Sequence, residues 1–592
     1  MPARRVLTVS VALLAAVALV TGTAASGNAA APDPARPAAQ QITGGGPGQY
    51  RYIVRVDGSE DLARTAVGQA GGTVVSSQPR IGTLVADLTP AGAAALHNAA
   101  GVRGVTADVP VQAQSLGFNP ATQGGSMTNI TRLTGAQAMW KKGFTGAGVD
   151  IAILDTGVAP VSGLTSPEKV FVGPDLSFES QDTDTRYLDS YGHGTNMAGL
   201  IAGREGAKST GTAYAADTTN FYGMAPDARL IPIKVADHAG AVDVSQVIAG
   251  IDWVIYSRYS NGLNIRVLNI SYGNISANDP QSDPVSWAAE SAWKAGIVVV
   301  ASAGNDGSAA AGVASPGFNP WIITVGGADT KGTDTYADDT VAAFSQVGDA
   351  THRGPDLVAP AVGVVSLGVP GSYLASTYPA AKVGNNFLRG SGTSQAAAIT
   401  AGGIALLLQQ FPYAAPNDVK ALLRTSAHAI AGTTTAYQRG GGELNLAQAT
   451  TLYPDTTSSQ SVPKGNGNGL LNKARGGNYV TIGGVALTGE KDILGTPWNS
   501  AVQAAQIADG TVWTWDGKFN GVAWIGTAGY TADTTSWAGK TWQGKTWQGN
   551  GWAGKSWQTG IWLGTGWSSA TWGGPVSSPT WASKAWFSGG WK

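Results

Sequence analysis

One serine, Ser394, lies where the surrounding backbone would favour a nucleophile. Ser394 begins a long Ala-rich run within the stretch RGSGTSQAAAITAGGIALLL, which starts at Arg389. Gly390 and Gly392 permit a close backbone approach just before it, and the residues after it are good helix formers. The pattern predicts a helix that begins near Ser394, where the free N–H groups and the helix dipole favour developing negative charge. Such a serine could attack a carbonyl group, although the same pattern is typical of a simple helix cap.

Two upstream residues could activate this serine. Asp155 follows the Val- and Ile-rich run VDIAIL, which predicts a buried parallel strand that ends in a carboxylate. His193 lies between glycines in YGHGTNMAGLIAG, ahead of an apolar helical run. A serine hydroxyl needs a base within hydrogen-bond reach. A histidine can take its proton, and an aspartate can hold the histidine tautomer and stabilise its cation.

Four motifs in one order resemble the subtilisin-like serine peptidases, the subtilases. They are LDTGV at Asp155, GHGT at His193, ASAGN at Asn305 and SGTSQAAA at Ser394, and the order aspartate, histidine, serine is that of subtilisin. The resemblance covers roughly residues 127–449. It implies a serine endopeptidase that acts on polypeptide substrates through a triad of Asp155, His193 and Ser394.

The resemblance also assigns an oxyanion donor and a substrate groove. The side-chain amide of Asn305 would donate to the oxyanion together with the Ser394 N–H, although Asn305 also opens an Asn-Asp-Gly turn signal. Backbone edges would pair with an extended substrate, and these edges comprise Ser271, Tyr272, Gly273, Ala301, Ser302, Ala303 and Gly304. Tyr272 and the small residues around Gly304 would help to line the pocket for the residue before the scissile bond.

The sequence departs from the common family pattern at three positions, which limits any transfer of substrate specificity. Asn196 stands where many subtilases have a second histidine, Ala361 where a glycine follows LVAP, and Ala398 where a proline is frequent in the serine helix. None of these positions carries a catalytic role.

Strand and helix signals alternate through the catalytic region, residues 125–450. Strands are expected at 230–235, 267–270, 297–301 and 321–325, with helices around 244–259 and 284–294. This alternation predicts an α/β fold with a doubly wound, mostly parallel sheet. Ligands bind at the carboxyl ends of such strands. Asp155, Ser271 and Asn305 each follow a strand, so we expect them to converge at one edge of the sheet.

The N-terminal region predicts export. Arg4 and Arg5 precede an apolar run at 6–20 and small residues up to Ala30, which is typical of a signal peptide at 1–30. The apolar run is short for a membrane span, which needs about 20 residues. We therefore expect no membrane span and a secreted, extracellular protein. A Pro-, Ala- and Gly-rich linker follows at 31–48.

Residues 49–115 predict a separate small domain. Their signals run β-α-β-β-α-β, which indicates an α+β fold. This region resembles the pro-region of subtilases. The resemblance implies an intramolecular inhibitor that assists folding and is removed by self-processing between residues 111 and 125. An unrelated accessory domain is the alternative.

The amino-acid composition argues against several classes of partner and cofactor. With 37 basic and 38 acidic residues, the chain gives no indication of a nucleic-acid partner. The absence of cysteine excludes disulfides and cysteine zinc sites. The proposed chemistry needs no cofactor, and we expect a monomer. Structural calcium stays open, but no calcium-loop spacing stands out and exposed loop acids are the favoured interpretation for Asp182, Asp184, Asp189, Asp338 and Asp339.

The C-terminal region changes composition after residue 450. A Ser-, Thr-, Gly- and Asn-rich linker is expected at 454–477 and a β-rich region at 478–592. Within 537–592, tryptophan recurs every fifth residue from Trp537 to Trp572, which indicates a solenoid-like repeat. The tryptophans could form the repeat core or, with five lysines and no acid after Asp533, bind a cell-wall polymer.

The sequence is also compatible with rival functions. The chain could be a cell-wall or surface-binding protein that uses the Trp repeat beside a degenerate or accessory hydrolase domain. It could also be a structural wall protein organised by that repeat, or a hydrolase of esters or other acyl groups.

Overall fold

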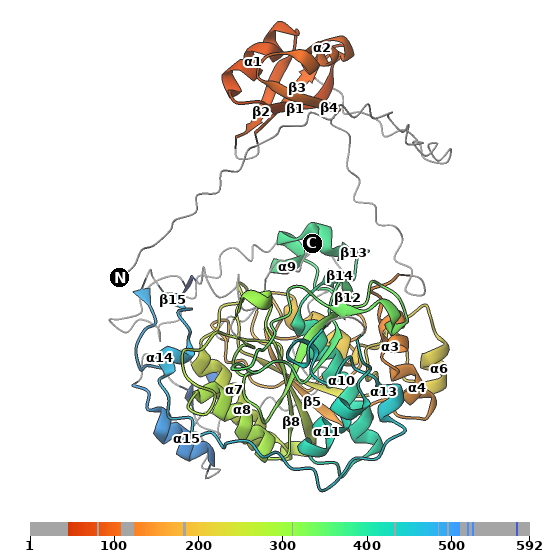
Figure 1. Ribbon diagram of the computed structural model, residues 1–592, viewed down its shortest axis with the longest axis vertical. Coiled ribbons are helices and arrows are strands. Elements are labelled where there is room, and N and C mark those ends of the chain that lie inside the picture. Colours follow the sequence, from red (N-terminus) through yellow and green to blue (C-terminus); the bar gives the residue numbers. More distant parts are fainter. Residues whose placement is uncertain are drawn as a thin grey trace, which may run out of the picture. The chain divides into compact units, whose positions relative to one another are not determined.

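The computed structural model describes most of the chain between residues 45 and 508. The described ranges are 45–79, 82–107, 123–180, 185–310, 312–430, 434–482, 485–493 and 497–508, followed by three two-residue strands. The predicted signal peptide and nearly all of the predicted Trp repeat lie outside these residues. The chain divides into two compact units, Met1–Gln114 and Ser115–Lys592 (Figure 1).

The first unit is a small α+β domain. Its elements are β1 (Tyr50–Val56), α1 (Glu60–Gln69), β2 (Thr73–Gln78), β3 (Thr83–Leu88), α2 (Pro90–Ala95) and β4 (Val102–Ala107). The strands form an antiparallel sheet in the order β2-β3-β1-β4. Ser59 and Thr89 cap the two helices through their side-chain oxygens, and Val54 and Val67 are buried in the core. The β-α-β-β-α-β order predicted for residues 49–115 is confirmed.

The second unit is built on a seven-stranded sheet in the order β10-β9-β8-β7-β5-β6, with β11 paired to β9. The strands are β5 (Asp150–Asp155), β6 (Arg229–Lys234), β7 (Ile265–Ile270), β8 (Val298–Ser302), β9 (Ile323–Asp329), β10 (Thr340–Val341) and β11 (Leu357–Pro360). All pairs except β10–β9 are parallel. Because helices cover both faces, the strands are nearly continuous apolar runs. The predicted α/β fold with a mostly parallel sheet is confirmed.

Four long helices flank this sheet. They are α5 (His193–Ala202), α7 (Val244–Ser257), α8 (Pro284–Lys294) and α10 (Thr393–Gln410). In Figure 1, α7 and α8 lie on one side of the sheet and α10 on the other. The α10 helix is buried from Thr393 through Leu408, which explains why its sequence is apolar and small on every face. No helix in the described part of the chain combines the length and apolarity that a membrane crossing requires.

Further helices and small sheets complete the second unit. The other helices are α3 (Met127–Leu133), α4 (Ala136–Lys141), α6 (Gly211–Ala216), α9 (Tyr373–Thr377), α11 (Pro416–Ser426), α12 (Ala436–Arg439), α13 (Leu446–Ala449), α14 (Leu471–Ala474) and α15 (Ser500–Ala508). A three-stranded sheet in the order β12-β14-β13 comprises β12 (Val364–Leu367), β13 (Lys382–Val383) and β14 (Phe387–Gly390). The last strands are β15 (Thr481–Ile482), β16 (Val485–Ala486), β17 (Lys518–Phe519), β18 (Trp524–Ile525) and β19 (Val576–Ser577).

The segment predicted as a linker at 454–477 is instead fixed along the surface of the second unit. The Trp321 indole donates to Pro463 O at 3.1 Å, and the Gly465 N–H donates to the Glu290 carboxylate at 3.1 Å. Asn466 N donates to Gln281 O at 2.8 Å. Small polar residues leave the backbone accessible, and here the neighbouring surface provides its hydrogen-bond partners. The β-rich prediction for 478–592 also missed a helix, α15.

A buried acid pair joins distant parts of the second unit. Asp339 and Glu443 are 2 % and 0 % exposed. Burial raises the pKa of Asp339, and burial together with the nearby Asp339 carboxyl raises the pKa of Glu443 well above its usual range. The neighbouring Tyr336 and His428 rings stack with their centroids 4.3 Å apart. Two neighbouring buried charges would repel strongly, so we expect at least one of these carboxyl groups to stay protonated.

This pair predicts that Glu443→Gln makes the protein more stable than wild type as pH rises. A carboxyl with a raised folded-state pKa contributes stability at low pH, and that stability is lost as pH rises from the ordinary value toward the raised one. The urea midpoints of the two proteins, measured in a Ser394→Ala background, should therefore diverge progressively as pH rises above the ordinary carboxyl value. Asp334→Asn, which changes a half-exposed carboxylate, is the matched control. Parallel pH profiles for Glu443→Gln and wild type would contradict the raised pKa of Glu443.

Candidate active site

Asp155 and His193 meet at the carboxyl edge of the sheet. Asp155 is the last residue of β5, and His193 is the first residue of α5. His193 Nδ1 donates to Asp155 Oδ1 at 2.8 Å, and both side chains are 1 % exposed. The same oxygen accepts the Thr156 N–H at 2.8 Å. This hydrogen bond selects the tautomer with the proton on Nδ1, which leaves Nε2 as the proton acceptor.

Asp189 holds the start of α5 in place. Its Oδ1 accepts Thr156 Oγ1–H at 2.7 Å and the Gly192 N–H at 2.6 Å, while its Oδ2 accepts the Thr195 N–H at 2.7 Å. Gly192 has φ +105°, a left-handed conformation that favours glycine. Asp189 is 1 % exposed and burial raises its pKa. Its interpretation as an exposed loop acid is therefore wrong, since it organises the turn that carries His193.

A short helix also packs on the residues before His193. In α9, Tyr373 N donates to Ser190 O at 3.1 Å and Leu374 N donates to Tyr191 O at 3.0 Å. The Tyr373 and Tyr191 rings stack with centroids 5.4 Å apart. The turn is thus held from two sides, by Asp189 and by α9. Neither support was visible in the sequence.

Ser394 lies in the first turn of α10 and is linked to the end of β7. Its Oγ donates to Ser271 O at 3.1 Å, and Ser271 Oγ donates to Ser394 O at 3.2 Å. Asn269 Nδ2 donates to Ser271 Oγ at 2.8 Å. The predicted helix start is confirmed, with Gly392 as the cap residue. In this rotamer the hydroxyl proton points to Ser271 O, so it must turn toward a base before attack.

Asn305 is oriented by Thr393. The Asn305 Oδ1 accepts both the Thr393 N–H, at 2.8 Å, and the Thr393 hydroxyl, at 3.0 Å. Thr393 Oγ1 in turn accepts the Gly304 N–H at 3.1 Å. Because two donors occupy Oδ1, the Nδ2 group is left to donate elsewhere, as an oxyanion donor must. The sequence pattern gave no role to Thr393, although its place directly before Ser394 was a usable signal.

The structure corrects the predicted substrate edge at 301–304. Ala301 and Ser302 are paired strand residues of β8. Ala303 N donates to Val325 O at 2.9 Å, its carbonyl accepts Ala314 N at 2.9 Å, and Gly304 O accepts Gln346 N at 3.1 Å. These backbone groups are already bonded within the fold, so this segment does not offer the open edge that we expected.

The second predicted edge, 271–273, is only partly available. Tyr272 is 1 % exposed and belongs to the hydrophobic core, and burial raises its pKa well above the usual range. It therefore does not line an open pocket as predicted. Gly273 is half-buried, and within the described residues its backbone makes no hydrogen bond. Gly273 is the position where an extended peptide can still pair.

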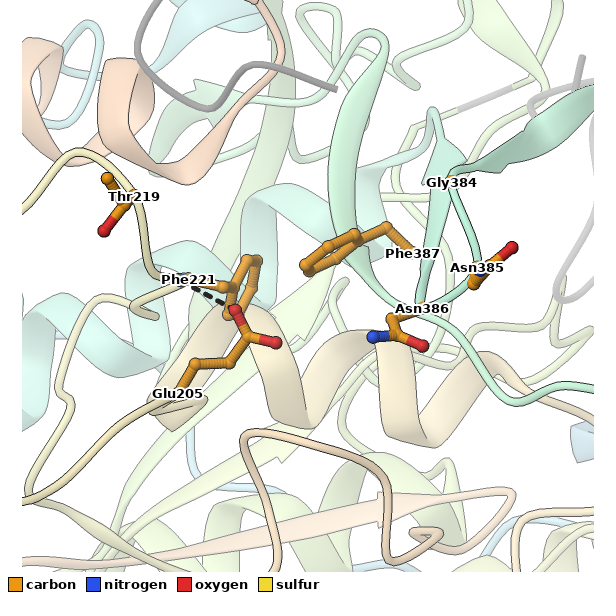
Figure 2. Close-up of a pocket in the computed structure, with 7 residues that line it drawn as sticks. All are labelled: Glu205, Thr219, Phe221, Gly384, Asn385, Asn386 and Phe387. Atoms are coloured by element: carbon orange, nitrogen blue, oxygen red, sulfur yellow. Dashed lines mark hydrogen bonds between the residues drawn. The ribbon is translucent and has the colours of Figure 1, made fainter. Parts of the chain in front are cut away.

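A surface pocket of about 380 Å³ lies beyond the C-terminal end of α5 and is separate from these residues (Figure 2). Its aromatic side chains, Phe221 and Phe387, have ring centroids 5.5 Å apart. Glu205 lines it, but its two oxygens already accept Ser162 Oγ–H at 3.2 Å and the Phe221 N–H at 3.0 Å. None of the predicted site residues lines this pocket.

The calcium candidates that the structure describes do not gather into a site. Asp182 and Asp184 lie outside the described residues. Asp338 accepts the Thr333 hydroxyl at 2.9 Å, and Asp339 belongs to the buried acid pair. Within the described residues, no group of three or more His, Asp or Glu side chains is arranged to hold a metal ion.

The orientation of Asn305 predicts a specific effect of Thr393→Val. The variant keeps the shape but removes the hydroxyl that bonds Asn305 and Gly304. Removing an oxyanion donor altogether costs about 10²–10³ in kcat, so loosening one should lower kcat by about tenfold, with KM nearly unchanged. Steady-state kinetics on a peptide anilide measures this.

Thr400→Val is the matched control, because the Thr400 hydroxyl bonds only to Ala396 O within the same buried helix among the described contacts. Equal kcat values for Thr393→Val and wild type would show that Thr393 does not orient the donor.

Comparison with known proteins places the chain in a family. A model of the subtilase family matches residues 146–469. The serine protease AprX of Bacillus subtilis is 37% identical over 286 residues, which cover 47% of this chain and 61% of AprX. Subtilisin Savinase of Lederbergia lenta is 31% identical over 315 residues, which cover 53% of this chain and 95% of Savinase.

Among solved structures, fervidolysin from Fervidobacterium pennivorans, a keratinolytic enzyme related to subtilisin, is 23% identical with a TM-score of 0.43. That similarity covers 71% of this chain and 64% of fervidolysin. The family model covers more than half of the 592 residues, and nearly all of Savinase is matched. The chain therefore belongs to the subtilase family.

Proposed function

We propose that this chain is the precursor of a secreted serine endopeptidase. Asp155, His193 and Ser394 form its catalytic triad, and Asn305 is its oxyanion donor. The observation that carries the proposal is the buried hydrogen bond from His193 Nδ1 to Asp155 Oδ1, at 2.8 Å. The helices that begin at His193 and at Thr393 pack against each other, which supports a shared site for the imidazole and the serine.

The first half of the reaction transfers the acyl group of the substrate to the enzyme. The Ser394 hydroxyl turns from Ser271 O to His193 Nε2, gives up its proton, and attacks the scissile carbonyl carbon. Asp155 stabilises the imidazolium that results. His193 then donates the proton to the departing amine as the peptide C–N bond breaks.

Two donors stabilise the tetrahedral oxyanion. One is Asn305 Nδ2, whose orientation is set by the two hydrogen bonds that its Oδ1 accepts from Thr393. The other is the Ser394 N–H, in the first turn of α10, where N–H groups have no intrahelical acceptor. Water then attacks the acyl-enzyme with His193 as base, which releases the acid product and restores Ser394.

The first unit is proposed as the intramolecular inhibitor that self-processing removes. Its fold, its place ahead of the catalytic unit and its compactness as a separate unit support this role. The N-terminal pattern at 1–30 supports secretion, and one relative, 28% identical, is the minor extracellular protease Epr of Bacillus subtilis. Polypeptides are the proposed substrates, the mature enzyme is proposed to be monomeric, and the Trp repeat is proposed to contact a cell-wall polymer.

This function predicts that wild type, but not Ser394→Ala, reacts with a fluorophosphonate probe and loses about the first 110–125 residues. Intact-mass measurement of both secreted proteins tests both points and maps the cut. Ser391→Ala is the control, because Ser391 accepts the Gly363 N–H at 2.9 Å and is proposed to have no catalytic role. Labelling or normal processing of Ser394→Ala would show that another residue is the nucleophile.

A further inference from the structure

A fully buried arginine fixes a segment that follows the residues matched by the family model. Arg475 is 0 % exposed. Its Nε donates to Asp243 Oδ1 at 2.7 Å and its Nη2 to Asp243 Oδ2 at 3.3 Å. Its Nη1 and Nη2 also donate to Gly489 O and Lys491 O. A buried guanidinium is stable only when its donors are satisfied, so these contacts tie Arg475 to Gly489 and Lys491 as well as to Asp243.

The acidic partner of this ion pair lies at the start of helix α7. Asp243 is the N-cap residue of α7, and its Oδ2 accepts the Ser245 N–H at 3.0 Å and the Ser245 hydroxyl at 2.6 Å. Ser245 Oγ also accepts Ile493 N–H at 3.1 Å. The segment is therefore anchored at two points on the start of α7, and Figure 1 shows α14 close to this helix.

The same segment holds the loop that follows the candidate substrate strand. Asn274 Nδ2 donates to Ala474 O, and Asn478 Nδ2 donates to Asn274 Oδ1 at 3.2 Å. Ala277 N donates to Lys473 O at 3.0 Å. The segment thus contacts this loop through both the side chain of Asn274 and the backbone at 277.

This loop follows closely in sequence after a residue that contacts the proposed nucleophile. Asn274 stands three positions after Ser271, whose carbonyl accepts the Ser394 hydroxyl. Three extended residues span about 10 Å. The backbone of Asn274 is already paired with Ser315, at 3.0 and 2.8 Å. Gly273, between these two fixed points, keeps the open edge described above.

We propose that Arg475 is a positioning residue for peptide binding. Through residues 471–478 it clamps the loop at 274–277, and this clamp holds the edge at Gly273 at the distance from Ser394 that an extended substrate requires. The proposal rests on the proposed peptidase function. Hydrogen bonds weaken steeply when their distance or angle departs from the ideal, so a displaced edge at Gly273 would bind an extended peptide less tightly. A substrate with a single acyl residue has no extended backbone to pair at this edge.

The test compares two substrates with the same residue before the scissile bond. One is a peptide anilide with four acyl residues, and the other is an ester with a single acyl residue. Arg475→Gln should raise KM for the peptide by about fivefold or more with kcat within about twofold, because uniform binding is lost. Its kcat/KM for the ester should stay within about twofold of wild type.

Lys464→Gln is the matched control. It removes the same charge from an exposed side chain that lies outside residues 471–478 and should leave both substrates unaffected. Equal losses on peptide and ester with Arg475→Gln, or an unchanged peptide KM, would overturn the proposal. If wild type itself hydrolyses neither substrate, the proposed function fails instead, so the two failures are distinguishable.

A second variant decides the matter if Arg475→Gln is not secreted. Asn478→Ala removes the contact to Asn274 and leaves the ion pair intact, so the peptide KM should rise by about two- to threefold with the ester unchanged. Asn274→Ala combined with Asn478→Ala should be no worse than Asn274→Ala alone, because both remove the same contact. Additive effects, or an unchanged peptide KM in Asn478→Ala, would contradict the clamp.

Discussion

The hydrogen bond between Asp155 and His193 is the constraint on which the rest of the structure depends. A carboxylate that is 1 % exposed is costly to bury unless donors surround it. Here the Thr156 N–H and the imidazole both donate to the same oxygen, Asp155 Oδ1. The parallel sheet brings Asp155 to its carboxyl edge, and Asp189 fixes the turn that presents His193. The sheet and the turn together place the carboxylate and the imidazole so that one tautomer of His193 is favoured.

The second requirement is that Ser394 reaches the same imidazole. The α5 and α10 helices pack closely because small residues line their contact. A Cβ on Gly402 would lie 2.8 Å from Ile201 O and 2.6 Å from the Met224 Cβ, so only glycine allows this approach. This packing fixes the position of the α5 start, which carries His193, relative to the α10 start, which carries Ser394. The Ala- and Gly-rich composition of α10 is therefore a geometric requirement as well as a helix signal.

Much of the framework was predictable because it is local and periodic. The helix expected at 284–294 matches α8 at both ends, and the strand expected at 267–270 lies within β7. The strand-end positions of Asp155 and Ser271 followed from the same patterns. Burial of whole strands and helices leaves a clear trace in composition.

The parts that were missed depend on single contacts between distant residues. Thr393 bonds Asn305 across 88 positions and Asp189 bonds Thr156 across 33, and neither pairing has a periodic signature. The edge at 301–304 was misassigned because a sequence does not show which backbone groups the sheet already uses. The segment at 454–477 was misjudged for a similar reason, since its polar composition is equally typical of a linker and of a bonded surface segment.

The most direct test of this account is the activity of Asp155→Asn. Asparagine has nearly the shape of aspartate, but its side chain carries an NH2 donor in place of one carboxylate oxygen. The imidazole should therefore lose its preference for the tautomer that leaves Nε2 as the proton acceptor. We expect kcat to fall by a factor of about 10⁴, with KM and thermal stability nearly unchanged. A loss of less than about tenfold would show that the Asp155–His193 hydrogen bond does not set the reactivity of Ser394.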